Sequence, residues 1–501
     1  MDPLERFGWR VLDSLSALGR AVVMPELTFT SAVDLASMIR EKKVSPIEVA
    51  EAYLQRIEEQ NPRLNAFVHV EPERVLREAH RAEDAVHRGE TLGPLHGVPL
   101  SVKSSIDVAG YRCEAGTKLR AGYIAARDAI LVARLRSAGA VILGVTNCPE
   151  LLMAWETDNL LYGRTNNPWD VARTAGGSSG GEAAAIAAGM SAGGVGSDGG
   201  GSIREPAHFC GICGLKPTPG RIPALGHFPT SVGPFAQLGV VGPMARTVDD
   251  VRLLFEVMAG YDDADVSAAP VALRLPAGGR AQEHSIGYFE QDGRTSVTAE
   301  TRAAVRDAVG ALKEAGFQTA PFRPENLEQA RDLWWKFFGI AGGMLLSPMT
   351  KGREQELSPL LRQFLGWVAK EPTHTGHTLL YTWLQRDELR TQFLAQMRVF
   401  SVLVCPVAAI PAFRHGERSW QVEGQEVKYL DAWSYTEWFN LLGFPACVVP
   451  VTRSAGGLPI GVQIVGRPWE EDLVLQVAAA LETRVGGYQA PQLKPRDLVA
   501  P

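Results

Sequence analysis

The sequence predicts an α/β fold with a mixed sheet, and three observations favour this class. Short apolar runs, helix-like segments and glycine-rich turns alternate along most of the 501 residues. Apolar residues make up 46% of the chain and charged residues 21%, which is typical of a globular protein. Six cysteines are too few to cross-link a chain of this length, so we expect reduced core cysteines and a cytoplasmic protein.

Residues 1–25 form an amphipathic segment that we separate from the main body. The apolar side chains of Leu4, Val11 and Leu15 fall near one face of a helix. Charged residues interrupt any apolar core there, which excludes a signal peptide. Packing on the main body, weak association with a membrane surface and a dimer contact all fit this pattern.

The elements that follow are predicted from apolar periodicity and capping residues. We expect two helices within residues 30–59, capped by Ser31 and Ser45, and further helices at 75–87, 128–138, 181–189, 247–259, 299–315 and 472–482. Strands are expected at 65–70, 98–102, 140–145, 195–196, 286–289, 402–407, 446–451 and 461–465. Residues 219–243 are predicted to be loop, and residues 267–284 are the best candidate for a linker.

Two segments, 332–383 and 433–440, are distinguished by many large aromatic side chains, and the first of them is predicted to be helical. A stripe of this kind usually belongs to a hydrophobic core. The alternative is that these side chains form the wall of a wide apolar pocket. The sequence pattern alone leaves both interpretations open.

Charge and hydropathy exclude several kinds of partner. The net charge is −6 and there is no run of lysine and arginine, so nothing favours nucleic acid. No apolar run is long enough to span a membrane. Cys210 and Cys213 form a C-x-x-C pattern without a second pair or a thioredoxin-like context, so we expect a buried structural pair.

The chemistry is concentrated in two glycine-rich turns between residues 174 and 219. Gly194, Gly196 and Gly199 match a dinucleotide fingerprint, but the helix precedes the glycines and no acidic residue follows at the required distance, which excludes that site. Ser179 is the centre of a G-x-S-x-G pattern, and an esterase built on it needs a later acid and histidine. The last histidine, His415, lies in a polar stretch, and this arrangement stays a rival hypothesis.

A serine and lysine pair is the other possibility for hydrolysis. A serine hydroxyl needs a base, and a buried lysine with a lowered pKa can act as one. Lys103 closes the apolar run 98–102, where a lysine is usually a solvated strand end. The consecutive N–H groups of Gly199, Gly200, Gly201 and Ser202 fit an oxyanion hole beside a nucleophile at Ser202.

Several motifs taken together resemble those of the amidase signature enzymes, over residues 30–485. They are GVPLSVK at 97–103, TNNPWD at 165–170, GGSSGG at 176–181, GSDGGGS at 196–202, CGICGLKPT at 210–218 and GLPIGVQIVG at 457–466. The fatty-acid amide hydrolase branch, and its type-2 members in particular, is the most similar. The resemblance implies one amidase-signature domain over residues 26–501, with a large, mixed, mostly parallel β-sheet covered on both sides by helices. Residues 267–284 are then a surface excursion.

The resemblance also implies a Ser–cis-Ser–Lys triad. Ser202 would be the nucleophile, Ser178 on a cis peptide bond would relay the proton, and Lys103 would act first as base and then as acid. Asp198 and Arg204 would support the glycine loop. No metal and no organic cofactor is implied.

The implied reaction is hydrolysis of the C–N bonds of apolar or aryl amides, and carbamates and esters share its acyl-enzyme chemistry. The variable region 332–440 would contribute to the substrate pocket, together with other bulky residues. The expected pocket residues are Met153, Trp155, Trp335, Phe338 and Trp438. Gly199 stands where members of the family often carry threonine or a branched residue, which opens space beside the acyl carbon. We expect a monomer or homodimer acting on a small-molecule amide or carbamate; the alternative is the amidase component of a tRNA-dependent amidotransferase.

Overall fold

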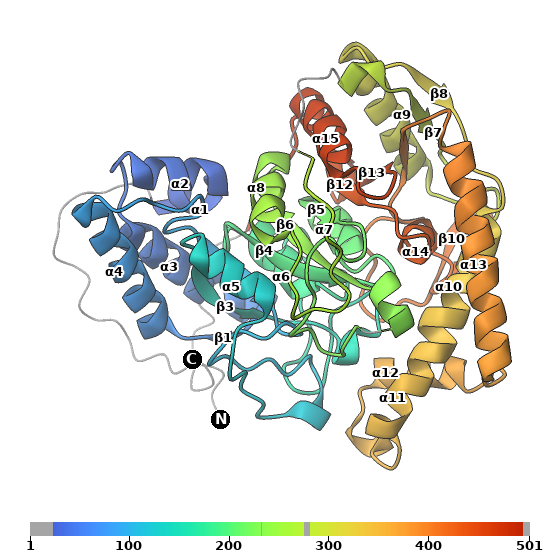
Figure 1. Ribbon diagram of the computed structural model, residues 1–501, viewed down its shortest axis with the longest axis horizontal. Coiled ribbons are helices and arrows are strands. Elements are labelled where there is room, and N and C mark those ends of the chain that lie inside the picture. Colours follow the sequence, from blue (N-terminus) through green and yellow to red (C-terminus); the bar gives the residue numbers. More distant parts are fainter. Residues whose placement is uncertain (1–23, 232, 275–280, 494–501) are drawn as a thin grey trace.

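The computed structural model describes residues 24–231, 233–274 and 281–493, so the segment 1–25 lies almost wholly outside the described residues (Figure 1). The strands are β1 Phe67–Val70, β2 Pro99–Lys103, β3 Val141–Thr146, β4 Gly193–Asp198, β5 Cys213–Lys216, β6 Val240–Ala245, β7 Ile286–Tyr288, β8 Thr319–Pro321, β9 Val402–Pro406, β10 Ser419–Val422, β11 Gln425–Lys428, β12 Ala446–Arg453 and β13 Pro459–Gly466. The helices are α1 Met24–Phe29, α2 Ala32–Arg40, α3 Pro46–Leu64, α4 Pro72–Arg88, α5 Ile130–Ser137, α6 Gly180–Ala187, α7 Arg204–Cys210, α8 Val248–Met258, α9 Ala299–Glu314, α10 Leu327–Trp334, α11 Gly342–Thr350, α12 Pro359–Val368, α13 Gly376–Gln396, α14 Ser434–Leu441 and α15 Glu471–Val485.

Eleven of these strands form one sheet in the order β1-β3-β2-β4-β6-β5-β12-β13-β9-β7-β8. The α/β class and the large mixed sheet are confirmed. The expected parallel pairing holds on the two flanks, where β2 pairs with β3 and β4 and β7 pairs with β8 and β9. The middle of the sheet, from β4 through β6, β5, β12 and β13 to β9, is antiparallel. A short connection such as that between β12 and β13 forms a hairpin, whereas parallel neighbours need a crossover.

Helices cover both faces of this sheet, as expected. Gly193 and Gly194 are neighbours in β4 and therefore face opposite sides. A Cβ atom at Gly193 would meet Leu254 of α8, and one at Gly194 would meet Glu182 of α6. In Figure 1, α1–α4 lie at one end of the sheet and α10–α13 at the other.

Local sequence explains where several helices begin. Ser31 accepts the Asp34 N–H and Ser45 forms a capping box with Glu48, which confirms both predicted caps. The prediction that residues 219–243 are entirely loop is wrong, because β6 begins at Val240. Strand β5, helix α7 and the separate β10–β11 hairpin were not predicted, because each is short and lacks a clear apolar period.

Two clusters of buried apolar side chains form the main cores. The larger one joins α2, α3, α8 and α15 to strands β1–β6, β12 and β13. The second is rich in aromatic rings from α10, α13 and α14, so most of the aromatic segments are core. All six cysteines are buried and free, which confirms the expectation of reduced core residues, Cys210 and Cys213 included. Within the described parts of the chain, no helix has the length and apolar character needed to cross a membrane.

Candidate active site

Three neighbouring backbone segments bring the predicted catalytic residues together. Lys103 is the last residue of β2, and Ser202 follows the end of β4, the strand that pairs with β2 in parallel. Ser178 lies just before α6, on a cis Gly177–Ser178 peptide bond. Because parallel neighbours end at the same edge of a sheet, Lys103 and the turn that carries Ser202 lie side by side.

Lys103 is completely buried and contacts only hydroxyl groups. Its Nζ donates to the Oγ atoms of Ser178 at 2.7 Å, Ser179 at 3.0 Å and Ser197 at 3.0 Å. Burial lowers the pKa of Lys103 to about 8, although the nearby carboxylates of Asp198 and Glu182 oppose this shift. The interpretation of Lys103 as a solvated strand end is therefore wrong, and a substantial neutral fraction exists near neutral pH.

The backbone around Ser178 is held by a buried carboxyl group. Glu205, at the start of α7, accepts the Gly177 N–H on Oε2 at 2.9 Å, while its Oε1 has no protein partner among the described residues. Burial raises the pKa of Glu205 well above its usual range. The Ser179 N–H donates to the Ser202 carbonyl at 3.1 Å, which joins the two serine turns.

Side chains distant in sequence fix the carbonyl groups of the glycine loop. The Trp334 indole N–H donates to the Gly199 carbonyl at 2.8 Å, and the Trp155 indole N–H donates to the Gly200 carbonyl at 2.9 Å. Thr436 also donates to the Gly200 carbonyl, at 3.0 Å. In a trans peptide the C=O and the following N–H point in opposite directions, so these bonds also orient the next N–H groups.

The four expected oxyanion donors are not equivalent. The Gly201 N–H donates to Asp198 Oδ1 at 2.7 Å, so this one donor is already occupied, which differs from the expectation. Within the described chain, the N–H groups of Gly199, Gly200 and Ser202 have no protein acceptor. Gly201 has a φ of 115°, and a Cβ atom there would lie 2.3 Å from Thr436 Oγ1. Only glycine fits this position.

Asp198 and Arg204 form a fully buried ion pair beneath the loop, as expected of supporting residues. Arg204 Nε lies 3.0 Å from Asp198 Oδ2. Burial alone would raise the pKa of Asp198, but the Arg204 guanidinium outweighs that effect and holds it well below its usual range. Arg204 also donates to Gln463 of β13 and to Thr436 and Asn440 of α14. The pair thus joins the catalytic loop to both cores.

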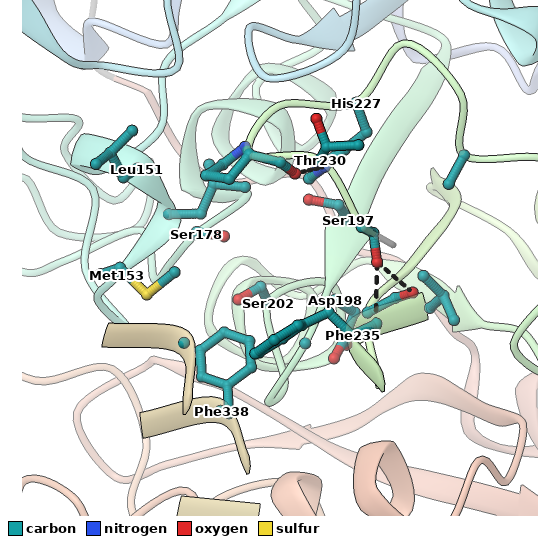
Figure 2. Close-up of a pocket in the computed structure, with 18 of the residues that line it drawn as sticks. Leu151, Met153, Ser178, Ser197, Asp198, Ser202, His227, Thr230, Phe235 and Phe338 are labelled. Carbon is teal, nitrogen blue, oxygen red and sulfur yellow. Dashed lines mark hydrogen bonds between the residues drawn. The ribbon is translucent and has the colours of Figure 1, made fainter. Parts of the chain in front are cut away.

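Two cavities open beside Ser202. The larger, of about 110 Å³, is bordered by Ser178, Ser202 and Gly199 and by apolar side chains, among them Leu151, Met153, Phe235, Phe338 and Leu345 (Figure 2). The smaller, of about 20 Å³, is bordered by Ser202 and Gly200 and by Met153, Trp155, Trp334, Phe338 and Phe364. Ser202 is thus the serine that faces both cavities.

The predicted pocket residues divide into two groups. Met153, Trp155 and Phe338 line one or both cavities, in agreement with the expectation. Trp438 lines neither, because its ring is buried in the aromatic core beside Phe289 and Tyr435. Trp335 also lines neither: its ring packs on Phe364 and its indole N–H donates to Glu371.

The rival nucleophile Ser179 is not placed for attack. Its side chain is fully buried, and its Oγ accepts from Lys103 and donates to the Ser197 carbonyl at 3.3 Å. It borders neither cavity. His415 instead contacts the Val171 carbonyl. Sequence patterns offered no signal for Trp334, Thr436 or Glu205, whose roles come from contacts across the fold.

Comparisons with known proteins agree with this geometry. The amidase family model, "Amidase", matches residues 48–475. An acylamidase of Rhodococcus erythropolis is 35% identical over 465 residues, which cover 91% of this chain and 95% of that protein. A glutamyl-tRNA(Gln) amidotransferase component of Carboxydothermus hydrogenoformans is 32% identical over 492 residues, or 93% and 99% of the two chains. A solved fatty acid amide hydrolase has a TM-score of 0.82 at 26% identity, covering 93% of this chain and 87% of its own. The chain therefore belongs to the amidase family and is a hydrolase that acts on amide C–N bonds.

Proposed function

We propose that this enzyme hydrolyses apolar or aryl amides through an acyl-enzyme on Ser202, with Ser178 passing protons between Ser202 and Lys103. The observation that carries the proposal is the buried Lys103 Nζ, which lies 2.7 Å from Ser178 Oγ at the edge of a cavity that Ser202 faces. A lysine in these surroundings is an effective base because burial disfavours its charged form.

The reaction proceeds in two halves. Neutral Lys103 takes the Ser178 proton as Ser178 takes the Ser202 proton, and Ser202 Oγ bonds to the carbonyl carbon. The N–H groups of Gly199, Gly200 and Ser202 stabilise the oxyanion. As the C–N bond breaks, the proton returns through Ser178 to the leaving nitrogen. Water then attacks the ester, the same residues take and return its proton, and the acid leaves.

The composition of the larger cavity supports apolar substrates. Apart from the catalytic edge, many of its walls are aliphatic or aromatic, with Leu151, Phe235 and Leu346 among them. Such a surface stabilises apolar or aryl groups by removing them from water. We expect anilides to react much faster than acetamide itself, and aryl carbamates and esters to react through the same acyl-enzyme.

Labelling with a fluorophosphonate probe tests the nucleophile. Wild type should be labelled and Ser202→Ala should not, while Lys103→Ala should label far more slowly. Ser179→Ala is the matched control and should label like wild type if it folds, which circular dichroism checks. Labelling that persists in Ser202→Ala and vanishes in Ser179→Ala would establish the rival esterase arrangement.

A second candidate, the amidase component of a tRNA-dependent amidotransferase, is favoured by the similarity to the Carboxydothermus protein. Turnover by the isolated chain separates the two. A free hydrolase turns over p-nitroanilides alone, and we expect a monomer or homodimer by light scattering. An amidotransferase component would be inactive alone and would co-purify with other chains from its native cells.

A further inference from the structure

We propose that Phe338 divides the active site into two unequal compartments, so that the leaving amine occupies the larger cavity and the acyl group the smaller. The preferred substrates are then short-chain acyl amides of bulky apolar amines. This inference rests on the proposed function and names the substrate class of that site.

The two cavities differ about fivefold in size and share a wall. Their volumes are about 110 Å³ and about 20 Å³, and Phe338, Met153 and Leu152 border both. A space near 20 Å³ has room for one or two groups the size of water. It therefore fits the methyl group of an acetyl but not a longer chain, whereas the larger cavity has room for an aromatic ring.

Proton transfer decides which part of the substrate enters which cavity. Ser178, which returns the proton to the leaving nitrogen, borders the larger cavity and not the smaller. Gly199 borders the larger cavity and Gly200 the smaller, so the proposed oxyanion donors lie where the two meet. A carbonyl with its oxygen at this junction directs its nitrogen toward Ser178 and its acyl chain toward the smaller cavity.

The smaller cavity has walls that are fixed by the catalytic loop itself. Trp155 and Trp334 border it, and their indole N–H groups bind the Gly200 and Gly199 carbonyls. A longer acyl chain would have to displace rings that also hold the proposed oxyanion loop. Enlarging this space by induced fit would therefore disturb the groups that stabilise the transition state.

Phe338 is held as a partition by its neighbours. Its ring stacks on Trp334 with centroids 4.9 Å apart and an interplanar angle of 14°. A Cβ atom at Gly199 would lie 2.5 Å from Phe338 Cε2, so the ring occupies the space that a side chain at position 199 would need. In Figure 2, Phe338 and Ser178 lie on opposite sides of Ser202.

Two substrate series measured with wild type, Phe338→Ala and Phe235→Ala test the assignment. The first series contains p-nitroanilides with acyl chains of increasing length, and the second contains N-acetyl amides of methylamine, aniline and 1-naphthylamine. For wild type, kcat/KM should fall about tenfold or more from acetyl to hexanoyl, because the added carbons have no space. It should rise from methylamine to 1-naphthylamine.

Phe338→Ala should lose most of the acyl-length penalty, since removal of the ring joins the compartments. Phe235 borders only the larger cavity, so Phe235→Ala should change the amine ranking and leave the acyl ranking as in wild type. If Phe338→Ala does not fold, Phe338→Leu replaces it and should relax the acyl ranking by a smaller factor.

The outcomes separate this inference from the proposed function. Ser202-dependent turnover that is as fast with hexanoyl as with acetyl anilides, or an acyl ranking unchanged in Phe338→Ala, overturns the partition and leaves the nucleophile intact. If no amide is hydrolysed in a Ser202-dependent way, the proposed function itself fails.

Discussion

At the scale of single residues, burial converts an ordinary lysine into a base. The ammonium group of Lys103 faces three serine hydroxyls and, among the described residues, has no carboxylate within hydrogen-bond distance. Hydroxyl groups solvate a neutral amine nearly as well as a charged one, so desolvation dominates. Lys103 is therefore ready to accept a proton through Ser178.

The rate should depend on pH through Lys103. The protonated amine is not a base, so kcat/KM for a p-nitroanilide should rise with pH and reach half its plateau near pH 8, where Lys103 loses its proton. Lys216 is a second buried lysine, whose pKa burial lowers to about 7, and it donates to the Pro217 carbonyl. Lys216→Met should keep the midpoint near 8. A flat profile between pH 6 and 9, or a midpoint abolished by Lys216→Met, contradicts this role.

Glu205 should act as a neutral hydrogen-bond acceptor that positions Ser178. Because its raised pKa keeps it protonated near pH 7, a glutamine should reproduce its bond to the Gly177 N–H. We expect Glu205→Gln to keep kcat within about threefold and Glu205→Leu to lose about tenfold, with KM little changed, as expected for one lost buried hydrogen bond. Equal loss in both variants, with equal loss of melting temperature, would mean a purely structural role.

At the scale of elements, the catalytic loop depends on helices that come much later in the chain. Trp334 ends α10, and Thr436 lies in α14, yet both hold the loop between β4 and α7. A π-helical turn, Trp335–Ala341, follows α10 and carries Phe338. Wider turns of this kind are frequent at functional sites because they redirect side chains.

Trp334→Phe tests this dependence, and Trp335→Phe is its matched control. Trp334→Phe keeps an aromatic ring but removes the donor to the Gly199 carbonyl, so kcat should fall about tenfold, as for one lost hydrogen bond. Trp335 donates to exposed Glu371, so its replacement should change kcat by less than about twofold. Steady-state kinetics on one anilide decides; equal effects of the two changes would contradict the assigned role of Trp334.

The sequence predicts the elements and the residues with local signals, and it fails where contacts are long-range. The end of β2 at Lys103 and the serine turns around α6 and β4 follow from apolar runs and glycine. The occupied N–H of Gly201 does not, because only the fold brings Asp198 Oδ1 to it. Likewise Trp335 and Trp438 are as aromatic as Trp155, and only tertiary packing determines which of the three borders a cavity.

At the scale of the whole molecule, buried ion pairs join distant parts of the chain. Arg204 connects Asp198 of β4 to β13 and α14, and Arg221 connects the loop after β5 to Glu471 of α15. Breaking a buried pair leaves an uncompensated charge, which costs more than the pair contributes. The two pairs have similar burial, but only the first touches the catalytic loop.

Arg204→Met and Arg221→Met should therefore both lower the free energy of unfolding by about 3–5 kcal/mol. Chemical denaturation measures this loss. In the folded fraction, Arg204→Met should also lower kcat, because Asp198 is no longer oriented toward the Gly201 N–H, whereas Arg221→Met should not. If Arg204→Met keeps full kcat per folded molecule, the ion pair does not shape the site.

The most direct measurement is the position of the covalent intermediate. The enzyme is mixed with excess p-nitrophenyl acetate, quenched in acid within the first turnover and digested, and the acylated peptide is sequenced by mass spectrometry. The proposal predicts an acetyl group on Ser202 and none in Ser202→Ala. An acetyl group on Ser178 or Ser179 of wild type would contradict it.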